Sequence, residues 1–512
     1  MGGHWGAELK YAGYDGVVIR GRAAVPVYLW IEDGKAELRE AKALWGLGNY
    51  ATTAALRAVH GPRARVVSCG PAGERLSRIA VIQTETGNAA GQGGYGAVMG
   101  AKRLKAIAVR GTQRPTYPDD QAMRRLVRRL NALVREGALG MTMLGTAGGV
   151  QNAERFGSLP LQNWRGGSWP EGAKAITGQT IRDTIWTHNT HCFACPIGCG
   201  KAIEIREGPY AGVKGEGPEY ETLCGFGGNL LIDDLAAVAR LNERCNQLGL
   251  DTISTSGVVA FATEAFERGL ITTADTGGIA LAWGQPEAAL ALVEKIARRE
   301  DIGDLLAEGS RAAARALGAG AEAFAMHVKG LEVPYHDPRA FLDMGLNYAT
   351  ANRGACHLES CTYWRGYGMQ WPGWQEGPYD RFAGGETAAR LVVEFQDYLS
   401  VFNPLGLCKF AVKGGLAPAH VAELVNTALG WDWSPADVLA TGRRLFELKR
   451  RINLRLGVTR ADDVLPPRFQ REPRPSGSAQ GVLPDLQPML EAYYRLRGWD
   501  AEGRPAGAEA QP

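Results

Sequence analysis

Three closely spaced cysteines are the first residues of this 512-residue chain whose types could do chemistry. Cys192, Cys195 and Cys199 form a C-x2-C-x3-C pattern in HCFACPIGCG, and Cys408 stands alone far downstream in NPLGLCKF. Thiolates are soft ligands, and a [4Fe–4S] cluster takes four of them. The pattern therefore favours an iron–sulfur cluster and electron transfer.

Other chemistry for these cysteines is less well supported. A structural zinc site usually repeats the C-x2-C element in a second pair, and no such pair occurs, so zinc stays a less favoured alternative. Nine cysteines in a long chain without an export signal do not indicate disulfides. Radical-SAM enzymes carry the reverse spacing and are set aside. Cys245 lies on the apolar stripe of a helix expected near 234–248, so we predict a core position for it.

Composition limits the class of protein. The 45% apolar and 22% charged residues are ordinary globular usage, and the length allows two to four domains. The 57 Lys plus Arg residues nearly balance the 54 Asp plus Glu residues, so the chain has no large positive charge of the kind that nucleic-acid-binding proteins carry. No apolar stretch reaches the roughly 18–20 residues of a spanning helix, and the start MGGHWGAELK does not resemble a signal peptide. We expect no membrane span and a cytoplasmic location.

The elements that must position these residues change character once along the chain. Short β-branched runs predict strands at 16–21, 26–34, 64–70, 78–84 and 105–111. Residues 112–120 are typical of a linker, and helical periodicity dominates afterwards. Besides 234–248, helices are expected near 121–136, 287–299, 302–317, 387–401, 419–429 and 435–455, with a frayed tail over the last fourteen or so residues. Strands first and helices afterwards predict an α+β fold with segregated domains.

A glycine-rich segment at 87–100 matches G-x-G-x-x-G through Gly91, Gly93 and Gly96. A dinucleotide fingerprint requires an acidic residue about twenty positions later, and none follows at 111–116. A Walker loop is also absent, because Ala101 displaces the lysine after Gly100. Two interpretations remain open: close backbone approach to an anionic ligand, or a tight structural turn.

Two distant segments share the pattern N-x-L-G-L-(D/C). They are NQLGLDT at 246–252 and NPLGLCK at 403–409. Chance can produce such a short agreement. The alternative is a pair of similar loops, each presenting a polar side chain and backbone amides to one half of a bipartite cofactor.

Several longer motifs, in order along nearly the whole chain, resemble the tungsten-dependent aldehyde:ferredoxin oxidoreductase family. They are GGHWGAELKYAGYDGVVIRG, GQGGYGAVMGAKRLKAIAVRG, CFACPIGCG, GEGPEYET, LGLDTIS, NRGACH, LGLC and YYRLRGW. The resemblance implies an N-terminal mainly β pterin-binding domain (1–118), which would be incomplete relative to the family. Two mainly α-helical domains (119–326 and 327–512) would follow, carrying the cysteine triplet with the first twin loop and the second twin loop with Cys408.

The resemblance also implies the cofactors. Family members hold one [4Fe–4S] cluster beside tungsten, or molybdenum in some relatives, bound by two pyranopterins. The positions that match cluster ligands are Cys192, Cys195, Cys199 and Cys408. The positions expected to contact the pterins are Gly2, Gly3, Gln92, Gly93, Gly94, Asn246, Asp251, Asn403 and Lys409.

For catalysis, the resemblance points to Glu221 in GPEYE and His357 in NRGACH. A carboxylate of raised pKa suits activation of water, and a histidine donor suits polarisation of a carbonyl. The implied activity is oxidation of a small aldehyde to a carboxylic acid, with electrons leaving through the cluster to ferredoxin. The alternatives are a related tungsten subunit, similar to aromatic acyl-CoA reductases, and a pterin-free iron–sulfur relay. Aromatic residues expected to shape substrate choice, or simply to pack, are Tyr363, Trp364, Tyr367 and Trp371.

Departures from the family pattern give further expectations. Members carry a segment before the motif that opens this chain, so either a late start site or a shortened, partly open pterin site is expected. Gln92 stands where an arginine is usual, and Asn246 and Asn403 replace aspartates, which removes charge beside the cofactor. Arg240 and Glu243 occupy an E-x-x-H position of iron-bridged dimers, which leaves a homodimer open but without bridging iron. The basic stretches 124–130 and 449–457 are expected to be solvated helix faces, or less favourably a ferredoxin-docking surface.

Overall fold

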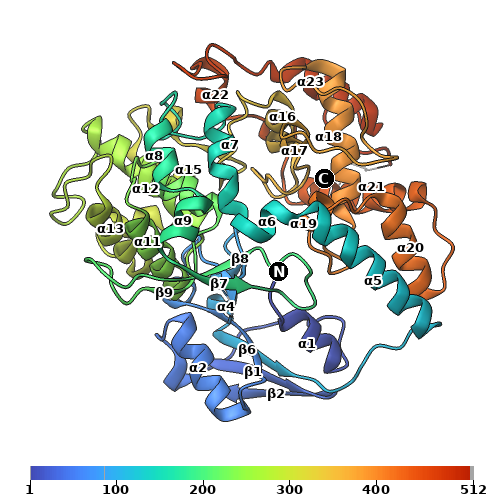
Figure 1. Ribbon diagram of the computed structural model, residues 1–512. Coiled ribbons are helices and arrows are strands. Elements are labelled where there is room, and N and C mark those ends of the chain that lie inside the picture. Colours follow the sequence, from blue (N-terminus) through green and yellow to red (C-terminus); the bar gives the residue numbers. More distant parts are fainter. Residues whose placement is uncertain (1, 86, 508–512) are drawn as a thin grey trace.

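A six-stranded sheet forms the N-terminal part of the protein (Figure 1). Its strands are β1 (Val27–Glu32), β2 (Lys35–Glu40), β3 (Arg65–Cys69), β4 (Ile82–Thr84), β5 (Ala89–Ala90) and β6 (Leu104–Arg110). They lie in the order β2-β1-β6-β3-β4-β5, with β1 and β6 parallel and the other neighbours antiparallel. The structure is a computed structural model that describes residues 2–85 and 87–507.

Helices cover both faces of this sheet, because its central strand β6 is apolar on both sides. Ile107 and Val109 pack in one cluster with Leu9 of α1 (Trp5–Tyr11) and Met99 of α4 (Tyr95–Ala101). The intervening Ala106 and Ala108 pack in a second cluster with Leu56 of α2 (Asn49–His60). Successive strand residues point to opposite faces, so an uninterrupted apolar run marks a strand that is buried on both.

The predicted strands at 26–34, 64–70 and 105–111 are confirmed as β1, β3 and β6. The strand prediction at 16–21 is wrong: these residues have no strand partner in the described structure, and Val18 is 83% exposed. The run 78–84 contributes a shorter strand, β4. The twelve-residue helix α2 and the hairpin strand β2 were not predicted. Strand β2 is mostly exposed and α2 is rich in small residues, so neither has a clear apolar periodicity in the sequence.

Beyond the linker the protein is mainly helical. The helices are α5 (Asp120–Gly137), α6 (Leu139–Leu144), α7 (Gly149–Arg155), α8 (Pro170–Ala175), α9 (Gly178–Thr184), α10 (Tyr220–Thr222), α11 (Leu235–Leu248), α12 (Thr252–Glu267), α13 (Pro286–Arg298), α14 (Ile302–Leu306), α15 (Ser310–Leu317), α16 (Leu342–Thr350), α17 (Tyr363–Gly366), α18 (Gly385–Ser400), α19 (Phe410–Lys413), α20 (Pro418–Leu429), α21 (Pro435–Arg455), α22 (Pro467–Arg471) and α23 (Leu486–Arg497), with α3 (Pro71–Glu74) in the sheet domain. One small sheet consists of β7 (Trp186–Thr190), β8 (Gly200–Glu204) and β9 (Lys214–Glu216). Another consists of β10 (His327–Val328) and β11 (Leu331–Glu332). A π-helical turn, Leu223–Gly228, directly follows α10.

Most helix predictions are confirmed to within two residues, and the α+β fold class is confirmed. The prediction of one helix at 302–317 is wrong, because Gly309 adopts φ +87° and separates α14 from α15. The frayed-tail prediction is wrong for residues 499–507: Trp499 pairs with Pro505, and Arg450 donates to the Gly503 carbonyl at 3.0 Å. The remaining tail residues, 508–512, lie outside the described part of the chain.

One apolar core runs through the helical part, from Ala72 to Trp499. The turn between β7 and β8, which carries the cysteine triplet, lies between this helical part and the N-terminal sheet domain (Figure 1). Figure 1 shows the N-terminal end of the chain beside this turn, near the middle of the molecule, and Phe193 donates a backbone hydrogen bond to the Gly3 carbonyl at 3.0 Å. Sheet domain and helical part therefore meet at the cysteines.

Candidate active site

The cysteine triplet lies on the turn after β7, and Cys408 lies on the loop between α18 and α19. The four thiols are within electrostatic range. Burial, then the charges of Glu219 and Cys408, raise the pKa of Cys199. Desolvation of the thiol raises the pKa of Cys408 to about 11, although the residue as a whole is exposed, and the charges of Cys192 and Cys195 add to the shift. Because each of these two shifts includes contributions from the other cysteines, the four thiols lie near one another in the fold.

The spacing of the thiols argues against a zinc site. A tetrahedral zinc ion with Zn–S bonds of about 2.3 Å needs sulfur atoms roughly 3.8 Å apart. Within residues 2–85 and 87–507, the donor atoms that gather within 4.8 Å of one another belong to Glu221, His336 and His357, and not to the cysteines. No three of the cysteine sulfur atoms in these residues are therefore spaced as closely as the ligands of one zinc ion.

The predicted residues Gly2 and Gly3 lie against the cysteine turn. A Cβ atom on Gly2 would lie 3.2 Å from Sγ of Cys192, and Gly3 adopts φ +83°. Burial raises the pKa of the Cys192 thiol, and a backbone hydrogen bond from Gly3 lowers it. This contact places Gly2 and Gly3 beside the cysteine triplet.

The glycine-rich turn contacts the first twin loop across the domain boundary. Gln92, Gly93 and Gly94 all have positive φ, of 55°, 96° and 72°. The Gln92 amide donates to Oδ1 of Asp251 at 3.1 Å, and the other oxygen of Asp251 accepts from the Ser254 amide at 2.7 Å. Asp251 therefore caps α12 and fixes the turn at the same time.

Atoms at this turn remain available to a ligand. Nε2 of Gln92 donates to the Glu332 carbonyl at 3.1 Å, whereas its buried Oε1 has no hydrogen-bond partner among the described residues. Arg353, which sequence reasoning missed, donates from Nη1 to the Gly91 carbonyl at 3.0 Å. Arg353 lies in the NRGACH motif, in which only His357 was predicted to be a site residue. A guanidinium beside a glycine-rich backbone suits an anionic, hydrogen-bonding cofactor such as a phosphorylated pterin.

The twin loops have different surroundings. The backbone carbonyl of Asn246 accepts a hydrogen bond from Nδ2 of Asn49, a residue of the sheet domain, at 2.9 Å. Burial raises the pKa of Tyr50 to about 12, and a hydrogen bond with the Asn246 side chain opposes that shift. Asn403 is exposed, and Lys409 donates to the Leu358 carbonyl next to His357. The second loop is thus the more open of the two.

Glu221 and His357 are brought together, although 136 positions separate them in sequence. Oε2 of Glu221 accepts from the Tyr335 amide at 2.8 Å, and its Oε1 lies 3.4 Å from Nε2 of His357. Burial raises the pKa of Glu221, whereas the charge of His357 and the Tyr335 amide lower it. Burial lowers the pKa of His357 to about 4, so its imidazole is neutral at pH 7. A carboxylate and a neutral imidazole therefore face each other in a buried site.

His336 is a further site residue that sequence reasoning missed. Its Nε2 also lies 3.4 Å from Oε1 of Glu221. Its ring stacks between Tyr220 and Tyr363, with ring centroids 4.6 and 3.9 Å away. Burial lowers its pKa well below the ordinary value. No spacing signal marks His336 in VPYHDPR; only packing of the loop after β11 against α10 and α17 identifies it.

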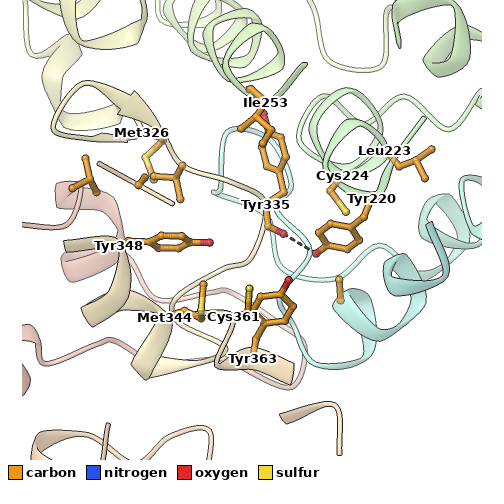
Figure 2. Packing of buried hydrophobic residues seen from close by; sticks show 14 of the residues in the cluster. Tyr220, Leu223, Cys224, Ile253, Met326, Tyr335, Met344, Tyr348, Cys361 and Tyr363 are labelled. Carbon is orange, nitrogen blue, oxygen red and sulfur yellow. Dashed lines mark hydrogen bonds between the residues drawn. The ribbon is translucent and has the colours of Figure 1, made fainter. Parts of the chain in front are cut away.

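A cavity of about 140 Å³ opens onto this cluster. Its polar wall includes Glu219, Glu221, His336, His357 and Lys413. Figure 2 shows the hydroxyl of Tyr220 pointing at the Tyr335 carbonyl, to which it donates at 2.7 Å, with Tyr363 close by.

The four aromatic residues expected either to shape substrate choice or to pack differ in their positions relative to the cavity. Tyr363 and Tyr367 line the cavity. Trp364 is fully buried, and Trp371 packs against Trp374 and donates to the Val412 carbonyl at 2.5 Å, so neither lines it. All four side chains are large and aromatic, so the sequence alone could not distinguish those that line a cavity from those that pack in the core.

Three other predictions can be compared with the structure. Cys245 is fully buried in the core, as expected. Arg240 and Glu243 pair with each other at 2.7 Å. The expectation of a solvated face at 449–457 is wrong at Arg450, which is 1% exposed and pairs with Asp463 at 2.8 Å.

Comparison with known proteins extends over the whole chain. The model of the aldehyde ferredoxin oxidoreductase N-terminal domain matches residues 1–111, and that of domains 2 and 3 matches residues 122–511. The chain is 40% identical over 509 residues to the tungsten-containing aldehyde ferredoxin oxidoreductase of Thermococcus kodakarensis, covering 98% of this chain and 82% of that protein. It is likewise 40% identical over 511 residues to the Pyrococcus furiosus protein of the same description, with the same coverage.

More distant relatives have other descriptions. The aliphatic sulfonate oxidoreductase WOR-like subunit of Pyrococcus furiosus is 32% identical, over 98% of this chain and 80% of that protein. A chain of the BamBC active-site complex of benzoyl-coenzyme A reductase, solved with 1,5-dienoyl-CoA, superposes with a TM-score of 0.82 at 24% identity, over 98% of this chain and 82% of that chain, which establishes the shared fold. In the described part of the chain no helix is long and apolar enough to cross a membrane. Family models over both parts of the chain, and relatives 40% identical over nearly all of it, show that this oxidoreductase belongs to the aldehyde ferredoxin oxidoreductase family.

Proposed function

We propose that the protein oxidises small aldehydes to carboxylic acids, with water as the source of oxygen. The balanced half-reaction is RCHO + H2O → RCOO⁻ + 3H⁺ + 2e⁻, and the electrons leave to ferredoxin or a similar acceptor. The observation that carries the proposal is the approach of Oε1 of Glu221 to Nε2 of His357, 3.4 Å apart, on the wall of a small cavity. The related tungsten-containing aldehyde ferredoxin oxidoreductases support the substrate class.

The residues present fit the two cofactors of such an enzyme. Cys192, Cys195, Cys199 and Cys408 would hold a [4Fe–4S] cluster. Gln92, Gly93, Gly94, Asp251 and the two loop asparagines Asn246 and Asn403, with Lys409, would hold a tungsten or molybdenum bis-pyranopterin. The positive φ values and the unpartnered Oε1 of Gln92 support this assignment. When bound, the metallopterin supplies two-electron oxidation, and the cluster carries electrons away one at a time.

The chain's own residues account for the proton chemistry. Glu221 accepts a proton from the attacking water at Oε1, which has no hydrogen-bond partner in the described structure. His357, neutral at pH 7, donates from Nε2 toward the carbonyl oxygen and stabilises the charge that develops there. Tyr335 holds Oε2 of Glu221 through its amide, so the carboxylate presents the other oxygen to the cavity.

Metal analysis and activity on anaerobically purified protein test the proposal. We expect about four irons with one tungsten or molybdenum per chain, and viologen reduction by short aldehydes. Glu221→Gln should abolish most of that reduction while keeping the metals, with Glu423→Gln on the surface as the matched control. Four irons without tungsten or molybdenum would contradict the proposal in favour of an electron relay. A fully loaded enzyme that ignores aldehydes but reacts with an aromatic acyl-CoA substrate would contradict it in favour of the reductase alternative.

A further inference from the structure

Lys413 places a cation on the wall of the same cavity that holds Glu221 and His357. It ends the short helix α19, five positions after Cys408. Its Nζ lies 5.3 Å from the ring centroid of Trp364 and 5.7 Å from that of Phe410. Aromatic faces and the cavity therefore surround this ammonium group.

Among the described residues, Lys413 has no anionic or carbonyl oxygen partner. Its one hydrogen-bond contact is a weak one, to Sδ of Met141 at 3.8 Å. Two other enclosed cations have acidic partners: Arg468 has Glu264 at 2.8 Å, and Lys329 has Asp463 at 2.9 Å. The charges of Cys361 and Cys199 act on this ammonium group, but no oxygen acceptor of the described residues contacts it, so its N–H donors are open to an anionic oxygen that enters the cavity.

The acidic residues of the cavity do not supply that anion. Glu219 accepts a hydrogen bond from the Thr146 hydroxyl, and Glu221 is held by the Tyr335 amide. Burial raises the pKa of Glu219 to about 7, which weakens its negative charge near neutral pH. Burial lowers the pKa of Lys413 to about 8, so the ammonium form still dominates at pH 7. The cavity can therefore accept a negatively charged group at the Lys413 end.

We propose that Lys413 binds a carboxylate on the substrate, so that the enzyme prefers short aldehydes carrying a second, anionic end. The aldehyde end would meet Glu221 and His357, and the carboxylate would meet Nζ of Lys413. A volume of about 140 Å³ admits a molecule of about benzene size, which corresponds to chains of roughly four carbons. This inference rests on the aldehyde oxidation proposed above and names its substrate class.

Two four-carbon aldehydes that differ at the far end test the proposal: succinic semialdehyde, with a carboxylate, and butanal, with a methyl group. In the anaerobically purified holoenzyme we expect kcat/KM to favour succinic semialdehyde at least tenfold. Lys413→Met should raise KM for succinic semialdehyde about 10–100-fold with a smaller change in kcat, the range of one charge-assisted hydrogen bond. Lys413→Arg keeps the charge and should keep most of the preference. Lys174→Met, at an exposed position on α8, is the matched control and should behave as the unchanged enzyme.

Binding of succinate to the holoenzyme, measured by calorimetry, gives a readout independent of turnover. We expect Lys413→Met to weaken succinate binding by the same factor, with Lys413→Arg close to the unchanged enzyme. Equal kcat/KM for the two aldehydes, or a preference that survives in Lys413→Met, would overturn the carboxylate site while leaving aldehyde oxidation intact. If neither aldehyde is oxidised by fully loaded enzyme, the proposed function fails, and the succinate measurement alone then decides whether Lys413 binds a carboxylate.

Discussion

Nε2 of His336 lies 3.4 Å from Oε1 of Glu221, the same oxygen that Nε2 of His357 approaches at the same distance. Burial lowers the pKa of both histidines, so two neutral rings flank the carboxylate at pH 7. Neither contact satisfies hydrogen-bond geometry, and Oε1 stays available to a water molecule or a substrate. The site thus has one proton acceptor between two potential donors.

Replacing His336 by phenylalanine should change the pH dependence of aldehyde oxidation. The new ring can keep the stack between Tyr220 and Tyr363 but offers no N–H group. An apolar ring beside Oε1 stabilises the charged carboxylate less than a polar imidazole does, so the substitution raises the pKa of Glu221 further above its ordinary value of 4.5. Glu221 must be ionised to accept a proton, so kcat/KM falls as pH falls through this pKa. We expect the acidic limb of the profile to move to higher pH in His336→Phe, whereas the exposed His188→Phe leaves it in place. An unmoved limb in His336→Phe would show that the ring serves packing alone.

Cys408→Ala should remove the iron–sulfur cluster, because a [4Fe–4S] cluster needs its four thiolates. Iron content and the electron paramagnetic resonance signal of the dithionite-reduced protein measure this loss. Cys245→Ala is the matched control: that cysteine is fully buried in the core, and its loss should leave the iron content unchanged. A normal cluster in Cys408→Ala would mean that another residue is the fourth ligand.

Gly94→Ala should destabilise the glycine-rich turn. Gly94 has φ +72°, and an added Cβ would lie 2.6 Å from the backbone oxygen of Arg78. The left-handed conformation alone costs an alanine about 1–2 kcal/mol, and the clash adds to this. A lower Tm in thermal unfolding, together with reduced tungsten or molybdenum content, is expected. Gly6→Ala in α1 meets no atom within 4 Å and should raise Tm slightly, because alanine favours a helix. Equal Tm values for the two variants would contradict this account.

The buried pair of Glu264 and Arg468 should make stability fall at acidic pH. Burial raises the pKa of Glu264, but hydrogen bonds and charge from Arg468 outweigh it, and the pKa lies below the ordinary 4.5. A carboxyl with a lowered pKa stabilises the folded state above 4.5, and this contribution is lost as pH falls through the folded-state value. At pH 7, Glu264→Gln leaves the guanidinium of Arg468 with only the half-exposed Glu472 as a counter-charge and should cost about 3–5 kcal/mol in free energy of unfolding. Glu423→Gln, which breaks the exposed pair with Arg129, should cost less than about 1 kcal/mol. Denaturant unfolding of both variants measures the difference, and similar losses in the two would refute the role assigned to burial.

Local periodicity accounts for the elements that could be predicted. The helices α5, α11, α20 and α21 lie within two residues of their expected bounds, because an apolar stripe or a capping residue belongs to the helix itself. Residues 16–21 have the composition of a strand but pair with no neighbour in the described structure. Strand formation needs a partner from elsewhere in the chain, so composition alone could not decide it.

The spacing of the cysteines, the motifs that carry the family resemblance, and the candidates Glu221 and His357 could all be identified without a structure. The positions of three further residues required the folded chain: His336 faces the same carboxylate oxygen, Arg353 reaches the glycine-rich turn, and Lys413 lines the cavity. The difference lies in how far apart the contacting residues are along the chain. Spacing patterns record contacts between residues on one element, whereas a catalytic site is assembled by packing between segments more than a hundred positions apart, and no local pattern records which side chains that packing brings within a few ångströms.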